Sequence, residues 1–103
     1  MKILKDILFG VTLLETKGST EKEVNKICFD SRQVDQGDLF VAVKGTRVDG
    51  HDYISQAVNQ GARSVLGEVR TEGLPEGITF LKTDNSARAL GIVAARYYDN
   101  PSE

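Results

Sequence analysis

The sequence predicts one small α/β domain of three layers, in which a mainly parallel sheet of about four or five strands is flanked by helices. Two observations lead to this prediction. Short apolar runs of strand length alternate with longer amphipathic segments. Residues 51–68 also read as helix, Gly-Ala and strand, which is the crossover order of a parallel sheet. A chain of 103 residues is expected to form a single domain around one core.

The N-terminal half is predicted to contain one helix and two strands. Apolar side chains at helical spacing predict a helix over residues 2–9, which Gly10 would end. Residues 11–23 are polar and contain glycine, so they are expected to form a loop. Strands are predicted over residues 24–29 and 39–43, and the second of these is the apolar run Leu-Phe-Val-Ala-Val.

The C-terminal half is expected to continue as helix, strand, strand and helix. The expected elements are a helix over 51–60, strands over 63–68 and 78–82, and a final helix to about Tyr98. The first of these helices carries Tyr53 on its apolar face, and Gly61 follows as its C-cap. Asp84 or Asn85 is expected to cap the final helix, and Pro101 follows that helix.

Composition argues against several classes of protein. Thirteen basic and fifteen acidic residues give a net charge of −2, whereas nucleic-acid-binding domains usually present a basic face. No apolar run approaches the roughly 20 residues of a membrane span, and the first residues lack the pattern of a secretion signal. Cys28 is the only cysteine, which fits a reducing compartment, and a single His makes a structural zinc site implausible. The expected location is the cytoplasm.

The common catalytic motifs are absent from this sequence. It contains neither the GxxxxGK[ST] phosphate loop nor a GxGxxG dinucleotide fingerprint after a strand. Asp30, Ser31 and His51 supply the residue types of a triad, but no nucleophile elbow accompanies them. We therefore expect a domain that binds and does not catalyse, with no catalytic residue, no metal and no cofactor of its own.

The Asp30-Ser31-Arg32 sequence directly follows a predicted strand and allows two interpretations. In the first it is a turn in which Asp or Ser accepts hydrogen bonds from free backbone N–H groups. In the second the Ser31 hydroxyl contacts a base edge or a phosphate at the carboxyl end of the strand, where ligands of open α/β sheets bind. Arg32 is expected to pair with Asp35 or Asp38, or to support the loop.

A second polar segment, Gly45–Gly50, joins a predicted strand to the next predicted helix. Such a junction directs backbone N–H groups and the positive end of a helix dipole outward, which suits an anionic or carbonyl-rich ligand. Lys44 and Arg47 would add positive charge for a diphosphate. His51 is expected to be a helix-start residue, and Cys28 to pack in the core.

Taken together, these motifs resemble a known family over nearly the whole chain. The resemblance lies in DSR-x-V-x-x-GDLFVA, G-x-x-x-DGH-x-(Y/F)-I and Q-GA before a strand, within residues 30–66, with ILKDIL before them and ARYYDNPSE after them. This pattern resembles the N-terminal domain of the Mur ligases, which extend the peptidoglycan stem peptide. Within the family it looks most like the MurE branch, which adds the third amino acid to UDP-N-acetylmuramoyl-L-alanyl-D-glutamate.

The resemblance implies a binding role for particular residues. In this family the N-terminal domain holds the UDP end of the UDP-MurNAc-dipeptide. Phe29 stands where a main-chain contact to uridine is expected, and Ser31 stands where a hydroxyl contacts it. Thr46, Arg47 and Val48 occupy the loop that closes over the uridine and diphosphate. Uracil offers one N–H donor between two carbonyl acceptors, a pattern that loop backbone matches whatever its side chains.

The family reaction is an ATP-driven amide ligation, in which a carboxylate becomes an acyl phosphate that an amine attacks. The resemblance implies that ATP, Mg²⁺ and the catalytic residues belong to central and C-terminal domains, which would be this domain's partners in the full-length protein. Two alternatives stay open from the sequence: the same domain of the sister ligase MurF, or a stand-alone nucleotide-binding or interaction module that catalyses nothing. A GTNGKT loop downstream would exclude the second.

Overall fold

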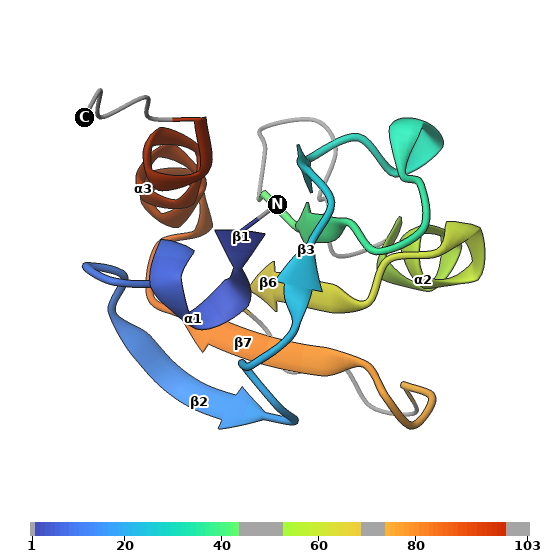
Figure 1. The fold of residues 1–103 in the computed structure, drawn as a ribbon, viewed down its shortest axis with the longest axis horizontal. Coiled ribbons are helices and arrows are strands. Elements are labelled where there is room, and N and C mark those ends of the chain that lie inside the picture. The colour runs from blue at the N-terminus through green and yellow to red at the C-terminus, as the bar shows by residue number, and fades with distance from the viewer. Residues whose placement is uncertain (1, 44–52, 69–73, 99–103) are drawn as a thin grey trace.

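The computed structural model describes residues 2–43, 53–68 and 74–98, and it confirms the predicted α/β class (Figure 1). Within these ranges the main sheet has five strands in the order β2-β7-β6-β5-β4. They are β2 (Leu13–Lys17), β4 (Ile27–Cys28), β5 (Leu39–Val41), β6 (Ser64–Gly67) and β7 (Thr79–Thr83). Strands β4, β5, β6 and β7 are parallel, and β2 pairs antiparallel with β7 at one edge.

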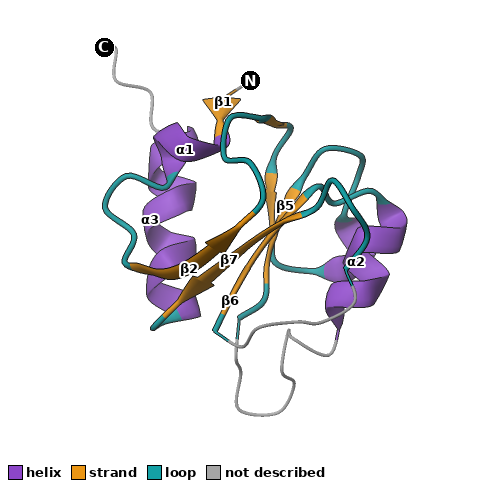
Figure 2. Cartoon of the chain, turned by 90° about the horizontal axis from the view of Figure 1, so that it is seen from below, coloured by secondary structure: helices purple, strands orange, loops and turns teal. Residues whose placement is uncertain are grey.

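Helices cover both faces of this sheet, so the predicted three layers are present (Figure 2). Helices α1 (Leu4–Ile7) and α3 (Ser86–Tyr98) lie on one face, and α2 (Ile54–Gln60) lies on the other. Strand β5 illustrates how side chains of one strand pack against the helices on both faces of the sheet. Leu39 and Val41 pack in the core with α1 and α3, whereas Phe40 packs in the core with α2. This alternation follows from the two-residue period of a strand.

The prediction that residues 11–23 form a loop is wrong, because they contain β2. This strand lies at the sheet edge, and its side chains are half-buried or exposed, Leu14 being 57% exposed. It is held by backbone pairing with β7, from Leu13 opposite Thr83 to Lys17 opposite Phe80. An edge strand with little buried apolar surface leaves a weak sequence signal.

The predicted strand 24–29 is also corrected, because it divides into two strands in different sheets. Strand β3 (Glu23–Val24) pairs with β1 (Lys2–Ile3) in a separate two-stranded sheet, and β4 belongs to the main sheet. The break falls at Asn25, whose N–H donates to the carbonyl of Gly37 instead of continuing a ladder.

The opening helix is shorter than predicted. Lys2 and Ile3 form β1, which pairs with β3, so they are not part of the helix. Helix α1 ends at Ile7, before Gly10, which has φ +97°. Phe9, counted among the apolar positions of that helix, is 71% exposed and lies against the Arg96 guanidinium, 4.9 Å from its ring centroid. The later elements begin and end within about three residues of the prediction wherever they are described, an ordinary discrepancy for element boundaries.

Both predicted helix caps on described residues are confirmed. Gly61 ends α2 with φ +126°, and its N–H donates to the carbonyls of Ala57 and Val58. Asn85 caps α3, because its Oδ1 accepts a hydrogen bond from the N–H of Arg88 at 3.0 Å.

Candidate functional site

A hollow of about 440 Å³ lies at the carboxyl ends of β4 and β5. Strand β4 delivers Phe29 and the Asp30-Ser31-Arg32 turn to it, and β5 leads to Val43 on its wall. The lining residues are Phe29, Asp30, Ser31, Arg32, Phe40, Val43 and Tyr53. This edge of a parallel sheet is where open α/β folds bind ligands.

The Asp30-Ser31-Arg32 sequence forms the turn of its first interpretation. It opens the 3₁₀ helix η1 (Ser31–Gln33), where Asp30 Oδ1 accepts a hydrogen bond from the N–H of Arg32 at 3.0 Å. The N–H of Gln33 donates to the carbonyl of Asp30 at 2.9 Å and closes the turn. Asp30 thus acts as an N-cap, the role that its position after a strand predicts.

The predicted ion pair of Arg32 with Asp35 or Asp38 is wrong. Its guanidinium donates instead to Asp30, from Nε at 3.1 Å and from Nη2 at 3.0 Å. These hydrogen bonds, followed by the bond from the Arg32 backbone N–H, hold the pKa of the Asp30 carboxyl below its usual value. The Arg32 side chain is 80% exposed, so the pair contributes little to stability; it places a cation together with its anion at the rim of the hollow.

Ser31 lies in the wall of the hollow and is only 5% exposed. Its carbonyl accepts a hydrogen bond from Gln60, and its hydroxyl makes no hydrogen bond to another residue of the described part of the chain. Phe29, expected to offer its main chain, is also 65% exposed as a residue and contributes an aromatic side chain to the lining. The hollow therefore combines a buried hydroxyl with an exposed aromatic surface.

Tyr53 is a lining residue that the sequence reasoning misplaced. The spacing predicts that it lies on the apolar face of a helix. In the structure it directly precedes α2, is 40% exposed and lines the hollow. A large aromatic residue at the end of a glycine-bounded polar loop was the signal that it borders the site.

Three of the predicted site residues, Thr46, Arg47 and Val48, lie outside the described residues, as do Lys44 and His51. The residues that border this undescribed segment are Val43 and Tyr53, and both line the hollow.

Cys28 has the structural role that was predicted for it. It is 6% exposed within the core beneath α2, and its thiol donates to the carbonyl of Asp30 at 3.0 Å. Burial raises the pKa of this thiol, which disfavours the reactive thiolate.

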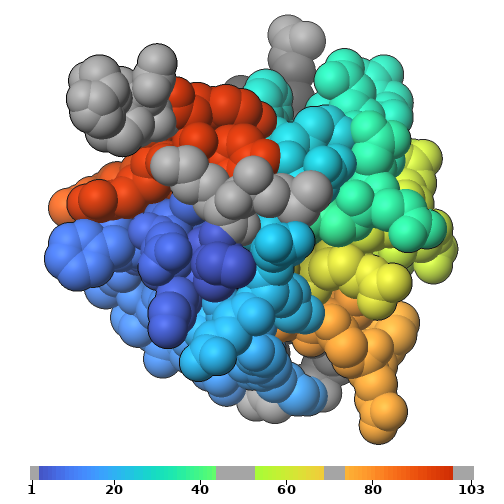
Figure 3. All heavy atoms as spheres, in the orientation of Figure 1, coloured from blue at the N-terminus to red at the C-terminus, as the bar shows by residue number. Residues whose placement is uncertain are grey.

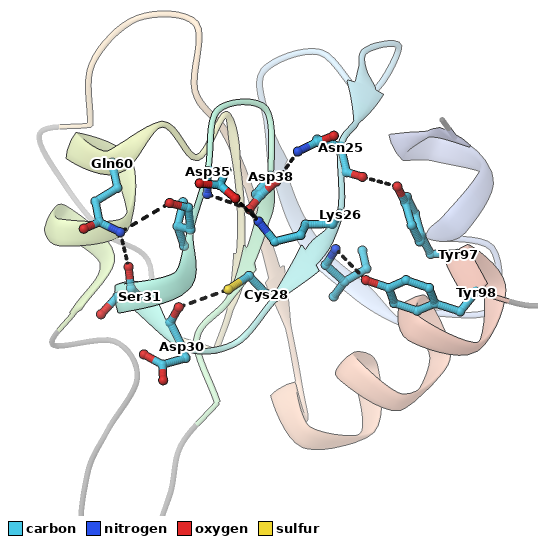
Figure 4. Close-up of polar contacts among 12 residues, drawn as sticks. Asn25, Lys26, Cys28, Asp30, Ser31, Asp35, Asp38, Gln60, Tyr97 and Tyr98 are labelled. Carbon is cyan, nitrogen blue, oxygen red and sulfur yellow. Dashed lines mark hydrogen bonds and ion pairs between the residues drawn. The ribbon is translucent and has the colours of Figure 1, made fainter.

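A cluster of charged groups holds the loop that follows the Ser31 turn (Figure 4). Lys26 Nζ lies 2.7 Å from Asp35 Oδ2 and 2.6 Å from Asp38 Oδ2. The Asp38 side chain is fully buried and also accepts from the N–H of Asp35 at 2.7 Å and from Asn25 Nδ2 at 3.1 Å. A buried carboxylate with this many donors is fully satisfied, so it fixes the 35–38 segment against β4.

The charge of Lys26 is secured over the ordinary pH range. The hydrogen bond to Asp35, and to a smaller extent the one to Asp38, raises the pKa of Lys26. The stabilisation that follows from a raised pKa is fully present below the unfolded-state pKa of about 10.4, and it is lost only as the pH rises through the higher folded-state pKa. The cluster is therefore expected to persist at neutral pH.

A second hollow, of about 540 Å³, is larger but lies elsewhere, beside β2 and the start of β7. Its walls include Glu15, Lys17 and Glu76, and it contains none of the predicted site residues. The hollow at β4 and β5 is the candidate site although it is the smaller one. It lies at the carboxyl ends of parallel strands, and predicted site residues line it.

Residues 2–43, 53–68 and 74–98 contain neither a side-chain cluster for a metal nor a membrane-spanning helix. No group of three or more His, Cys, Asp or Glu side chains is placed there to hold a metal ion. No helix in those ranges is long and apolar enough to cross a membrane. The sequence also has no GxxxxGK[ST] loop.

Similarity to known proteins extends over almost all of the chain. The ligase named UDP-N-acetylmuramoyl-L-alanyl-D-glutamate–2,6-diaminopimelate ligase from Cytophaga hutchinsonii is 39% identical over 96% of this chain and 21% of its own length. The ligase of the same name from Bacteroides fragilis is 40% identical over 96% of the chain and 20% of its own length. The chain thus spans about a fifth of these relatives.

Solved structures of related ligases share the fold. MurF from Acinetobacter baumannii superimposes with a TM-score of 0.63 at 32% identity, over 73% of this chain and 16% of that one. MurF from Thermotoga maritima in complex with ADP gives a TM-score of 0.57 at 34% identity, over 66% of this chain and 15% of that one. The family model described as "Mur ligase family, catalytic domain" matches residues 23–98. The chain therefore belongs to the Mur ligase family.

Proposed function

We propose that this domain holds the UDP moiety of UDP-MurNAc-L-Ala-D-Glu for an ATP-dependent ligase of the MurE type. The observation that carries the proposal is the hollow in which Phe29, Ser31 and Tyr53 meet at the carboxyl ends of β4 and β5. The aromatic rings suit the face of a pyrimidine base, and the Ser31 hydroxyl suits its polar edge. Arg32 is paired with Asp30 at the rim, and the N–H groups of its guanidinium that Asp30 does not take can donate to a diphosphate.

The segment with Thr46, Arg47 and Val48 completes the proposed site. Its bordering residues Val43 and Tyr53 line the hollow, which supports placing the uridine contacts of this segment there. Backbone N–H and carbonyl groups of a loop match the donor and acceptor pattern of uracil, and Arg47 adds a cation for the diphosphate. With Phe29 and Ser31, these are the proposed substrate-binding residues.

The chemistry of ligation is proposed to lie beyond residues 1–103. The curated relatives are about five times longer than this chain. ATP, Mg²⁺ and the catalytic groups are assigned to central and C-terminal domains of the full-length protein, and no residue here is assigned a catalytic role. We propose that such an enzyme works in the cytoplasm. It would add the third amino acid of the peptidoglycan stem peptide.

The equivalent domain of MurF is the alternative, favoured by the likeness to solved MurF structures. The curated relatives named for the diaminopimelate reaction cover more of this chain at higher identity, so the MurE type is preferred. An assay of the full-length protein with nucleotide-linked dipeptide against tripeptide distinguishes the two, and only the dipeptide is expected to be extended.

Replacing Ser31 by alanine in the full-length ligase tests the proposed binding role. Losing one neutral hydrogen bond of about 1 kcal/mol is expected to raise KM for the UDP-linked substrate roughly fivefold while kcat changes little. The contact is remote from the reacting carboxylate, so it stabilises substrate and transition state alike. Ser55→Ala, at an exposed position of α2, is the control. A fall in kcat with KM unchanged would contradict the proposal.

A further inference from the structure

The Ser31 turn is too short to hold its own position. It is a 3₁₀ helix of three residues, closed by the bond from Gln33 N–H to the carbonyl of Asp30. A single turn of this kind leaves its following carbonyl groups without partners inside the turn. Those of Ser31 and Val34 must be satisfied from another element.

Gln60, the last residue of α2, supplies both partners (Figure 4). Its side-chain Nε2 donates to the carbonyl of Ser31 at 2.5 Å and to the carbonyl of Val34 at 3.3 Å. A primary amide is suited to this, because it carries two N–H donors that can reach two acceptors.

Further contacts hold the same loop against the end of α2. The N–H of Gly37 donates to the carbonyl of Gly61 at 2.9 Å, and the N–H of Arg63 donates to the carbonyl of Asp38 at 3.1 Å. In the space-filling view the loop and α2 form one continuous surface (Figure 3). Hydrogen bonds from the C-terminal end of α2 and the residues just after it therefore hold the loop that carries Ser31 in place.

Helix α2 also helps to position Tyr53, another lining residue of the hollow. Tyr53, which lines the hollow, directly precedes α2, and Ile54 and Ala57 anchor that helix in the core with at most 1% exposure. One short helix thus positions Tyr53 at its beginning and holds the Ser31 turn at its end.

We propose that Gln60 is a positioning residue of the nucleotide site: its amide holds the Ser31 turn so that the Ser31 hydroxyl meets the uridine nucleotide. Gln60 does not line the hollow itself, so it acts through the turn. This inference rests on the proposed function of the site.

The test replaces Gln60 by glutamate in the full-length ligase. The carboxylate keeps the length of the side chain but cannot donate, and it faces two carbonyl oxygens. KM for the UDP-linked substrate is expected to rise roughly fivefold while kcat is retained. Asn59→Asp is the matched control, since it makes the same amide-to-carboxylate change at an exposed position in the same helical turn.

The outcomes separate positioning from simple stability and from the proposed function. A merely structural role for Gln60 would reduce the amount of folded enzyme, and so the apparent kcat, without changing KM. An unchanged KM for Gln60→Glu, with a raised KM for Ser31→Ala, overturns the positioning role alone. An unchanged KM for both variants overturns the proposed site.

A measurement on the unmodified chain covers the case in which the variant does not fold. The side-chain amide signal of Gln60 in an NMR spectrum is expected to shift when UDP is added, because ligand contact with the turn alters its two hydrogen bonds. The amide of Gln56, one turn earlier in α2, serves as the reference. Shifts around Ser31 without a shift at the Gln60 amide would overturn the inference.

Discussion

Replacing Gly61 by alanine is expected to lower the free energy of unfolding by about 3 kcal/mol, from backbone strain and a steric clash together. Gly61 has φ +126°, a conformation that L side chains rarely adopt. A Cβ at this position would lie 2.7 Å from the Cα of Gln36 and 2.9 Å from its nitrogen, which are backbone atoms and cannot rotate aside. Thermal unfolding followed by circular dichroism should show a Tm lower by on the order of 10 °C.

Gly77 provides a control that separates strain from the clash. It also has positive φ, +90°, but a Cβ there would meet no atom within 4 Å. Gly77→Ala is therefore expected to cost only the backbone term, about 1 kcal/mol. Equal losses for the two variants would show that the close approach of Gly61 to Gln36 does not govern the stability of this junction.

Replacing Asp38 by alanine is the second change expected to have a large effect. Its side chain is fully buried and accepts hydrogen bonds from Lys26, Asn25 and the N–H of Asp35. Removing it leaves Lys26 with Asp35 as its remaining carboxylate partner, and takes away the acceptor of the Asn25 amide and of the Asp35 N–H. Because Lys26 is 34% exposed and keeps one carboxylate, the loss is expected to be about 2 kcal/mol, within the range for hydrogen bonds to a charged group. Unfolding in urea at neutral pH measures the loss.

Asp35→Ala is the matched control, since Asp35 is the other carboxylate on Lys26. Its distance to Nζ is 2.7 Å against 2.6 Å for Asp38, but its side chain is 75% exposed. Exposed pairs contribute under about 1 kcal/mol, so this variant should lose much less stability. If the two alanine variants were equally stable, burial of Asp38 would not be what holds the loop.

The parallel core was predictable because its strands are buried on both faces. Phe40, Val65 and Leu81 are 0–1% exposed, and such strands appear in sequence as short continuous apolar runs. The edge strand β2 was not predictable in the same way. It is held by backbone pairing with β7, and backbone hydrogen bonds leave no pattern of apolar residues in the sequence.

The turn of the candidate site was predictable from local chemistry, but its surroundings were not. Asp30 caps η1 through its own neighbours in sequence, so its residue type and position were enough. Gln60 lies 29 residues from Ser31 and meets it only when α2 packs on the sheet. Arg32 was assigned the wrong partner for a related reason, because Lys26 reaches Asp35 and Asp38 across the loop.

An NMR titration of this chain with UDP tests the central claim most directly, because it asks where the nucleotide binds without requiring the rest of the enzyme. Amide signals of residues 29–32 and 45–50 are expected to shift together, with weak affinity, since the proposed function assigns the other contacts of the substrate to domains outside this chain. Residues that line the second hollow, such as Glu15 and Glu76, should not shift. Shifts confined to that second hollow, or none near residues 29–32, would contradict the assignment of the uridine site.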